Sequence, residues 1–201
     1  MAELSKVKIL HNKTKQLVQP HIVRLTEGYA NDLIDSIWWK NIPIESRNAE
    51  DDEHWNWASL IRRYCNGFFF RCVGLISPDE LYVEGALLYQ INAKSQLEAD
   101  VGCFYIERLA AAPRNRHWLI SDHVYTGVGS ALLYWTVRQS YSRGLGGRIL
   151  LESLPSSNTV NFYLKKGFIP TGKKNHRSKL EYYELPKDAA EAWMKGEGDF
   201  V

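Results

Sequence analysis

The segment Tyr125–Leu133 reads YTGVGSALL and places Gly127 and Gly129 where a loop enters a predicted helix. Glycine lets the backbone approach a ligand closely, and the N–H groups in the first turn of a helix have no partner inside the helix. Such a turn can bind an anionic group such as a phosphate. Because a Gly-x-Gly also occurs in turns that bind nothing, the rest of the chain has to decide its role.

Two further side chains could move protons. Tyr163 lies in NFYLKKGF, and Glu107 lies inside the apolar run CFYIERLAAAP. A tyrosine hydroxyl can donate a proton, and apolar surroundings raise the pKa of a carboxyl group toward that of a useful base. Alternatively, Tyr163 packs in the core with its helix neighbours, and Glu107 pairs with Arg108 or another cation.

Several other chemistries lack their motifs. Leu132 occupies the last glycine position of a dinucleotide-binding Gly-x-Gly-x-x-Gly, and a hydrolase Gly-x-Ser-x-Gly is absent. The six histidines form no His-x-x-x-His pattern, so we expect no metal site. Cys65, Cys72 and Cys103 are an odd number at wide spacing, which predicts reduced thiols in the core.

Composition limits the class of protein. Of the 201 residues 45% are apolar and 24% charged, which predicts one globular domain over residues 1–201, with residues 1–19 as an N-terminal extension. The net charge of +2 is spread along the chain, so nucleic acid is not an expected partner. With a polar start and no long apolar run, the sequence predicts a cytoplasmic protein without membrane contact.

The elements that must position these residues begin with a strand and a helix. Thr26 is a plausible N-cap of that helix, and Asn66-Gly67 ends a second one. Aromatic and branched residues then indicate strands, two of them adjacent and antiparallel across a turn at Ser77–Glu80. The predicted elements are a strand at 22–25, a helix at 57–64, and strands at 68–76, 81–91 and 100–113.

After an irregular linker, the Gly-x-Gly opens a helix over Gly129–Ser142 whose apolar face carries Leu133, Val137 and Tyr141. That spacing predicts a helix with one side packed on a sheet. RILLESL is typical of a buried parallel strand. Ser156 or Ser157 can cap a further helix that ends at Gly167, and FIPTG and KLEYYEL are the final strands.

Four segments in this order, YIERLAAAP, GVGSALLYW, GRILLESLP and NFYLKKGFIPTG, resemble the GNAT N-acetyltransferase superfamily. The resemblance covers the chain from about Leu81 onward. It implies an α/β (α+β) fold with a mixed, mostly antiparallel central sheet and helices on both faces. It also implies a splayed central strand pair, formed by the strand at Leu109–Ala112 and the strand at Ile149–Leu154.

The same resemblance implies direct transfer of an acetyl group from acetyl-CoA to a primary amine, without an acyl-enzyme or a metal. The acceptor is a small molecule or a protein, and a homodimer is one assembly open to the chain. The alternative is a CoA-binding regulatory module of the same fold with weak or no catalysis.

The resemblance also assigns roles to residues. Backbone N–H groups of the turn hold the pyrophosphate, the pantetheine pairs along the small-residue strand, and a backbone N–H there stabilises the oxyanion. Tyr163 protonates the leaving thiolate and Glu107 is the favoured base, while Glu84, Glu98, Asp100 or a water stay open for that task and Glu152 can orient a ligand. The predicted cofactor contacts are Leu109, Ala110, Ala111, Ala112, Gly127, Val128, Gly129, Ser130, Ala131 and Asn158.

One position departs from the family pattern: Val124 stands where the phosphate loop usually has Arg or Gln. Arg114 or Arg116 can supply that charge from the linker, which is longer than usual. Otherwise, backbone amides must bind the pyrophosphate.

The acceptor site implied by the resemblance is rich in aromatic and acidic residues, which attract a cationic amine. The alternative, which we favour, is that the tryptophans belong to the core and the acidic turn is solvated. The basic run at Lys173–Arg177 is interpreted as a solvated loop. The implied acceptor residues are Trp38, Trp39, Glu50–Glu53, His54, Trp55, Trp57, Tyr182 and Tyr183.

Overall fold

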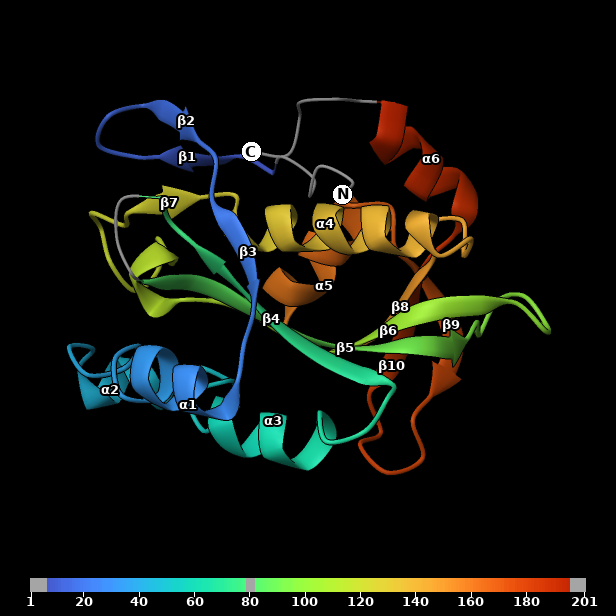
Figure 1. Ribbon diagram of the computed structural model, residues 1–201, viewed down its shortest axis with the longest axis horizontal. Coiled ribbons are helices and arrows are strands. Elements are labelled where there is room, and N and C mark those ends of the chain that lie inside the picture. Colours follow the sequence, from blue (N-terminus) through green and yellow to red (C-terminus); the bar gives the residue numbers. More distant parts are fainter. Residues whose placement is uncertain (1–6, 79–81, 196–201) are drawn as a thin grey trace. The chain divides into compact units, whose positions relative to one another are not determined.

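A computed structural model describes residues 7–78 and 82–195 (Figure 1). These residues fall into two compact units. Within the described residues, the first unit holds the chain from residue 7 to Leu88 together with Arg108–Leu132, and the second holds Tyr89–Glu107 and residues 133–195. The single domain expected over residues 1–201 stays a prediction.

Seven strands form a mixed sheet in the order β3-β4-β5-β6-β8-β10-β9. The pairs β3–β4, β8–β10 and β9–β10 are antiparallel, and β6–β8 is parallel. The mostly antiparallel sheet of the predicted α/β fold is therefore confirmed. The strands are β3 (His21–Arg24), β4 (Phe70–Ile76), β5 (Val83–Lys94), β6 (Gly102–Ala111), β8 (Ile149–Ser153), β9 (Ile169–Lys174) and β10 (Glu181–Leu185).

The parallel ladder between β6 and β8 is short. It joins Phe104 to Ile149, Tyr105 to Leu150 and Ile106 to Leu151, which is three of the ten residues of β6. The half of β6 that follows Ile106 therefore keeps backbone groups that this ladder does not use, as a splayed strand pair requires.

Several short helices on one side of the sheet strands belong to the first unit. Thr26 caps α1 (Glu27–Ala30), as predicted, and the chain continues as one π-helical turn, η1 (Asn31–Asp35). Next come α2 (Ile44–Arg47) and α3 (Trp57–Tyr64). Apolar residues of α1, η1 and α3 pack on one side of β4, β5 and β6.

Trp38 and Trp57 are core residues of the first unit, 3% and 2% exposed. The indole of Trp38 donates to the backbone oxygen of Val83 at 2.8 Å, and the two rings meet edge-on at 6.0 Å. Since a buried indole N–H needs a partner, this bond fixes the segment that follows η1 against β5. The core interpretation of these two tryptophans is confirmed.

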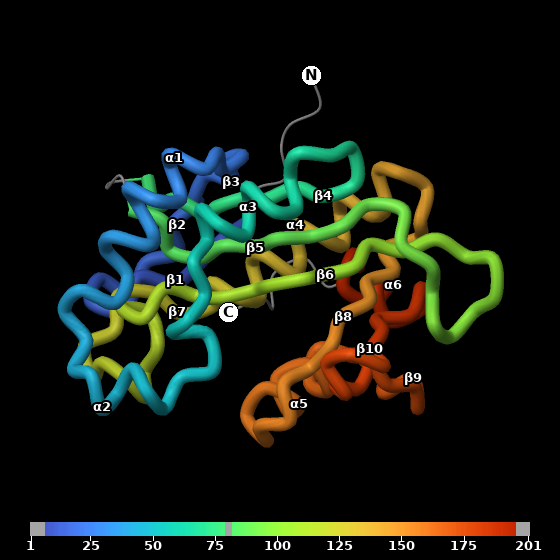
Figure 2. Tube along the Cα trace, turned by 90° about the horizontal axis from the view of Figure 1, so that it is seen from below, coloured from blue at the N-terminus to red at the C-terminus, as the bar shows by residue number. Residues whose placement is uncertain are grey.

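The described part of the N-terminal extension, residues 7–19, is folded, which the sequence analysis missed. Strands β1 (Ile9–His11) and β2 (Gln16–Val18) form a hairpin, and β1 also pairs with β7 (Tyr125–Thr126), which directly follows the linker predicted to be irregular (Figure 2). Ile9 is completely buried. These strands have two or three residues each, too few to show a clear alternation of apolar and polar positions.

Helix α4 (Val128–Ser142) begins one residue before the predicted start, but the prediction of a single packed face is wrong. Every residue from Ser130 to Val137 is buried. The run SALLYWTV carries apolar or small side chains almost all round the helix, and a helix of that kind is buried on all sides.

In the second unit, α5 (Ser157–Lys165) is capped by Ser156 and followed by Gly167 at φ +83°, as predicted. A last helix, α6 (Lys187–Lys195), was not predicted. Its Trp193 donates an indole N–H to the backbone oxygen of Lys166 at 2.9 Å. This contact anchors α6 to the end of α5.

Two predicted boundaries differ from the structure. Phe68 and Phe69 are 85% and 55% exposed and precede β4, so the strand expected from residue 68 starts at Phe70. The predicted turn at Ser77–Glu80 and the strand start at Leu81 extend into residues 79–81, which lie outside the described residues.

Gly85 gives a test of how α4 packs in the first unit. A Cβ atom at this position would lie 2.6 Å from Val128 Cγ1 and 3.1 Å from the backbone oxygen of Ala110. We expect Gly85→Ala to destabilise the protein by roughly 1–3 kcal/mol through overpacking, as measured by urea denaturation. Gly67→Ala, which meets no atom within 4 Å, is the control, and equal stability of both variants would contradict this packing.

Candidate active site

The glycine turn lies at the start of α4 in the first unit. Gly127 has φ +90°, a conformation that favours glycine, and α4 begins at the next residue. The backbone N–H of Tyr125 donates to Asn115 Oδ1 at 3.0 Å, which fixes the chain just before the turn. The predicted junction of loop and helix is therefore present.

The turn offers fewer donors than the sequence analysis assumed. The N–H of Ala131 donates to the backbone oxygen of Gly127 at 2.8 Å, and Ala131 is 1% exposed. Its assignment as a pyrophosphate donor is therefore wrong, because the first bond of the helix already uses that N–H. The N–H groups of Val128, Gly129 and Ser130 precede this bond, in the first helical turn, and they suit an anionic group.

The end of β6, which is predicted to contact pantetheine, presents one side to the core and the other partly to the surface. Ala110 and Ala112 belong to the core of the first unit, whereas Leu109 and Ala111 are half-buried. The N–H of Ala112 donates to the backbone oxygen of Glu84 at 2.7 Å. An oxyanion or an amide chain would therefore have to use backbone groups of residues 109–111.

Glu84 is completely buried and fully paired. Its carboxylate accepts from Arg114 Nε at 3.0 Å, from Arg114 Nη2 and from Asn115 Nδ2 at 2.9 Å. The Arg114 guanidinium also lies 3.5 Å from the centre of the Tyr82 ring. Because these donors hold both oxygens, the carboxylate has a structural role that leaves it poorly placed to act as a base.

Arg116 is the centre of a second buried ion pair cluster. It is 5% exposed and donates to Glu50 Oε2, to both oxygens of Asp52 and to the backbone oxygen of Ala111. Desolvation lowers the pKa of the guanidinium, but bonds to Asp52 and Glu50 outweigh it and raise that pKa. With Arg114 paired to Glu84, neither arginine is left to replace the charge missing at Val124.

The acidic run is thus not the solvated turn that we favoured, since Glu50 and Asp52 are only 13% and 12% exposed in their side chains. Beside it, the first unit has a hollow of about 330 Å³. The carboxylate of Asp35 in its wall accepts from the N–H groups of Trp57 and Ala58, which caps α3. The hollow is lined by Ile34, Asp35, Trp39, Arg47, Glu53, His54, Trp55, Asn56 and Trp57.

Tyr163 lies in the second unit, on α5, and is 8% exposed. Its ring meets Phe168 at 5.4 Å and Phe162 at 5.3 Å. Tyr163 is more buried than its neighbour Phe162, so it also packs in the core of this unit, as the alternative interpretation expects. Burial raises the pKa of the Tyr163 hydroxyl, so it stays protonated at neutral pH, as a proton donor must. Asn158, in the first turn of α5, is exposed.

Glu107 is half-buried in the second unit, close to a polar network. Glu152 Oε1 accepts from the Tyr105 hydroxyl at 2.9 Å and from Asn175, and its Oε2 accepts from Ser178 at 2.6 Å. Burial, and after it the charges of Glu107 and Glu152, raise the pKa of Tyr105. Glu152 therefore ties Asn175 and Ser178 of the β9–β10 loop to β8. The basic side chains of the run are all exposed, as predicted for a solvated loop.

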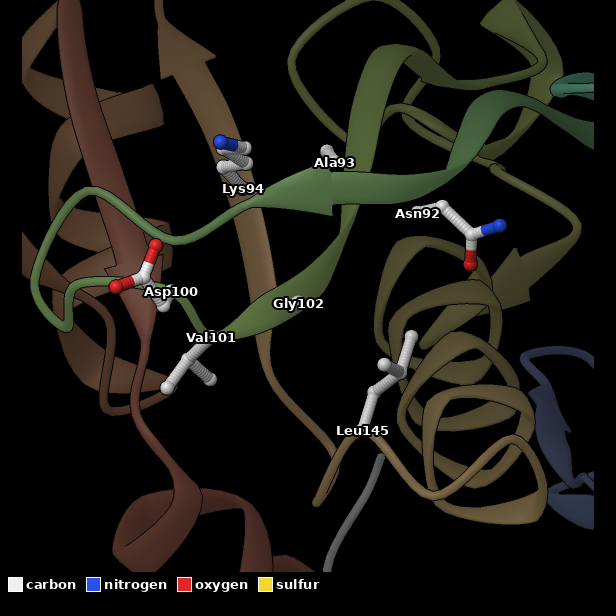
Figure 3. A pocket seen from close by; sticks show the side chains of 7 residues that line it. All are labelled: Asn92, Ala93, Lys94, Asp100, Val101, Gly102 and Leu145. Carbon is white, nitrogen blue, oxygen red and sulfur yellow. The ribbon is translucent and has the colours of Figure 1, made fainter.

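Among the remaining candidate bases, Glu98 pairs with Arg148 at 2.8 Å. Asp100, at φ +61°, lines a different hollow of about 250 Å³ between the ends of β5 and β6 (Figure 3). Leu145 closes one side of it, 2.9 Å from the point where a Cβ atom of Gly102 would stand. This second hollow contains no predicted cofactor contact.

The other expected exclusions concern thiols, metals and membranes. All three cysteines are free thiols, and burial raises the pKa of Cys103 to about 12. Within residues 7–78 and 82–195, no three His, Cys, Asp or Glu side chains are grouped to hold a metal ion. No helix in this part of the chain has the length and apolar character needed to cross a membrane.

Comparisons with known proteins identify the fold. FdhC, a nucleotide-linked sugar GNAT, is 13% identical, with 99% of both chains covered and a TM-score of 0.58. A GNAT family acetyltransferase from Desulfovibrio desulfuricans is 15% identical over 84% of this chain and 99% of its own, with a TM-score of 0.53. A mutant AtaT toxin bound to the C-terminus of the antitoxin AtaR and acetyl-CoA is 14% identical over 88% of this chain and 99% of its own, with a TM-score of 0.53.

The chain therefore has the GNAT fold, which confirms the resemblance seen in the sequence. No family model matches the chain, and no curated protein is similar to it in sequence. The structural similarity comes at 15% identity or less in these three proteins, so it carries the fold and not the acceptor.

The Arg116 cluster can be tested through stability. Arg116→Ala would leave Glu50 and Asp52 as buried, unpaired charges, and we expect it to lower the free energy of unfolding by about 3–5 kcal/mol in urea denaturation. Arg62→Ala, which breaks an exposed pair with Glu27, should change little. Similar losses in the two variants would show that the cluster does not anchor the acidic segment.

Proposed function

We propose that this protein is an acetyl-CoA-dependent N-acetyltransferase that transfers the acetyl group directly to a primary amine. The observation that carries the proposal is the glycine turn at the N-terminus of α4, where Val128 packs on Gly85 of β5 close to the end of β6, in a GNAT fold. Val128 and the backbone oxygen of Ala110 both approach Gly85, so the turn and the strand end are neighbours.

This arrangement suits the two parts of CoA. The pyrophosphate is anionic, and the N–H groups of Val128, Gly129 and Ser130 with the helix dipole would hold it without a cationic side chain. The pantetheine is an amide chain, and the backbone of residues 109–111 would pair with it as a strand does. Bound acetyl-CoA would supply the thioester that reacts.

The reaction needs an oxyanion donor and an acid. A backbone N–H of residues 109–111 would stabilise the tetrahedral oxyanion, and such a donor is worth roughly 10²–10³ in rate. The Tyr163 hydroxyl, kept protonated by burial, would protonate the departing thiolate.

Removal of the proton from the amine is assigned to Glu107. Its charge acts on Tyr105 and Tyr182, which places the carboxylate within the polar network of the second unit. Glu84 and Glu98 are weaker candidates because arginines hold their carboxylates. The acceptor is a small-molecule or protein amine, and the hollow beside Trp39, Glu53 and Trp55 offers the rings and the negative charge that attract a cation.

A regulatory CoA-binding module is the second candidate. Val124 in place of the usual Arg or Gln favours it, because it removes a cation from the phosphate loop. A screen of amines, amino acids and peptide N-termini with thiol release as the readout separates the two. Tight binding of acetyl-CoA with no release for any acceptor would favour the regulatory module.

Tyr163→Phe tests the acid. We expect turnover to fall by roughly 10²–10⁴ while the Kd for acetyl-CoA stays nearly unchanged, since only the hydroxyl is removed. Because burial raises the pKa of this group above about 10, wild-type turnover should show no loss from Tyr163 ionisation below that pH. Phe162→Leu, beside it on α5, is the control, and full activity of Tyr163→Phe would remove Tyr163 from the mechanism.

Gly129→Asp tests the phosphate loop. A carboxylate in the first turn of α4 would repel the pyrophosphate and fill space next to the backbone, so we expect acetyl-CoA binding measured by calorimetry to weaken by at least about tenfold. Gly28→Asp is the control. It adds the same charge at an exposed position of α1, where an added Cβ atom would have no other atom within 4 Å. Equal affinities in both variants would refute the loop assignment.

A further inference from the structure

The N-terminal hairpin holds the segment that leads into the glycine turn. Asn12, directly after β1, donates from Nδ2 to the backbone oxygen of His123 at 3.0 Å and accepts at Oδ1 from the Thr126 hydroxyl at 3.0 Å. Its backbone N–H donates to the backbone oxygen of Val124 at 2.9 Å. One residue thus binds three positions of the four-residue segment before Gly127.

The contacts of this segment form a small network. Thr126 Oγ1 also lies 3.2 Å from His123 Nε2. Since the Thr126 hydroxyl has one hydrogen and gives it to Asn12, the His123 ring is the donor in that contact. The ring of His11 meets Tyr125 edge-on at 5.1 Å.

The opposite side of the segment is held by the linker. Asn115 accepts from the N–H of Tyr125 at 3.0 Å, and Val124 donates its N–H to the backbone oxygen of Arg114 at 3.0 Å. The strand β7 is therefore fixed between the linker and the hairpin. Only Gly127 separates β7 from the first residue of α4.

The hydrogen bonds of Asn12 and Asn115 to this segment matter because the phosphate loop lacks its usual cationic side chain. Val124 stands at that position. Backbone N–H groups bind an anion well only if they already point at it, since any reordering on binding reduces affinity. The direction of the N–H groups of Val128–Ser130 depends on the chain that enters the turn.

We propose that Asn12 is a positioning residue for the pyrophosphate of acetyl-CoA, acting through β7 on the N–H groups of Val128–Ser130. This inference rests on the proposed function. An asparagine suits the task because its amide donates to one backbone oxygen and accepts from one hydroxyl at once. The N-terminal hairpin is thereby part of the cofactor site, although it supplies no contact to the reacting atoms.

The experiment compares wild-type protein with Asn12→Ala and with Thr126→Val, which removes the partner hydroxyl. We expect Asn12→Ala to raise the Kd for CoA about tenfold in calorimetry, with turnover at saturating acetyl-CoA unchanged. The double variant should lose less binding free energy for CoA than the sum of the losses in the two single variants, because both substitutions remove the same hydrogen bond. Thr14→Ala, exposed in the same hairpin, is the matched control.

A second donor distinguishes positioning from general loss of structure. S-acetylpantetheine lacks the pyrophosphate, so kcat/KM for this donor should be the same in wild-type protein and in Asn12→Ala. An equal loss for both donors, or a lower melting temperature with an unchanged Kd for CoA, would overturn the inference. If wild-type protein itself fails to bind CoA, the proposed function fails first, which is a separate and recognisable result.

Discussion

The buried carboxylate of Glu84 is the constraint on which the first unit depends. A charge that is completely removed from water must be paired, and Arg114 and Asn115 provide the pairing from the residues just after β6. Asn115 also accepts from Tyr125, so the same residue ties the buried charge to the entrance of the glycine turn. These polar contacts, together with the 3₁₀ turn η2 (Pro113–Asn115), therefore order this part of the linker.

A second buried charge extends this organisation to the acidic segment. Arg116 joins Glu50 and Asp52 to the backbone oxygen of Ala111, at the end of the strand that would pair with pantetheine. Both linker arginines thus stabilise the fold instead of facing a ligand. An anion at α4 would be bound by oriented peptide dipoles, which are effective only when the surrounding chain is rigid.

The proposed acid is a group whose surroundings hold it in the protonated state. Tyr163 is buried among aromatic rings, which keeps its hydroxyl protonated. Glu152 has three hydrogen-bond donors and is committed to holding the β9–β10 loop. Glu107, on the neighbouring strand, is the carboxylate to which we assign the catalytic role, whereas the hydrogen bonds of Glu84 and Glu152 give these two structural roles.

From the sequence alone, the order of the main strands and helices between β3 and β10, the caps at Thr26 and Ser156 and the glycine turn could be predicted, because periodicity, capping and turn residues are local signals. The GNAT fold was implied by the resemblance of four segments to that superfamily. The N-terminal hairpin, β7 and the long-range contacts were found only in the folded chain. Arg116 finds its carboxylates more than sixty residues away, and Asn12 reaches β7 across more than a hundred. Hydrogen bonds and ion pairs between residues so far apart leave no pattern in a single sequence, since each partner alone is an ordinary polar residue.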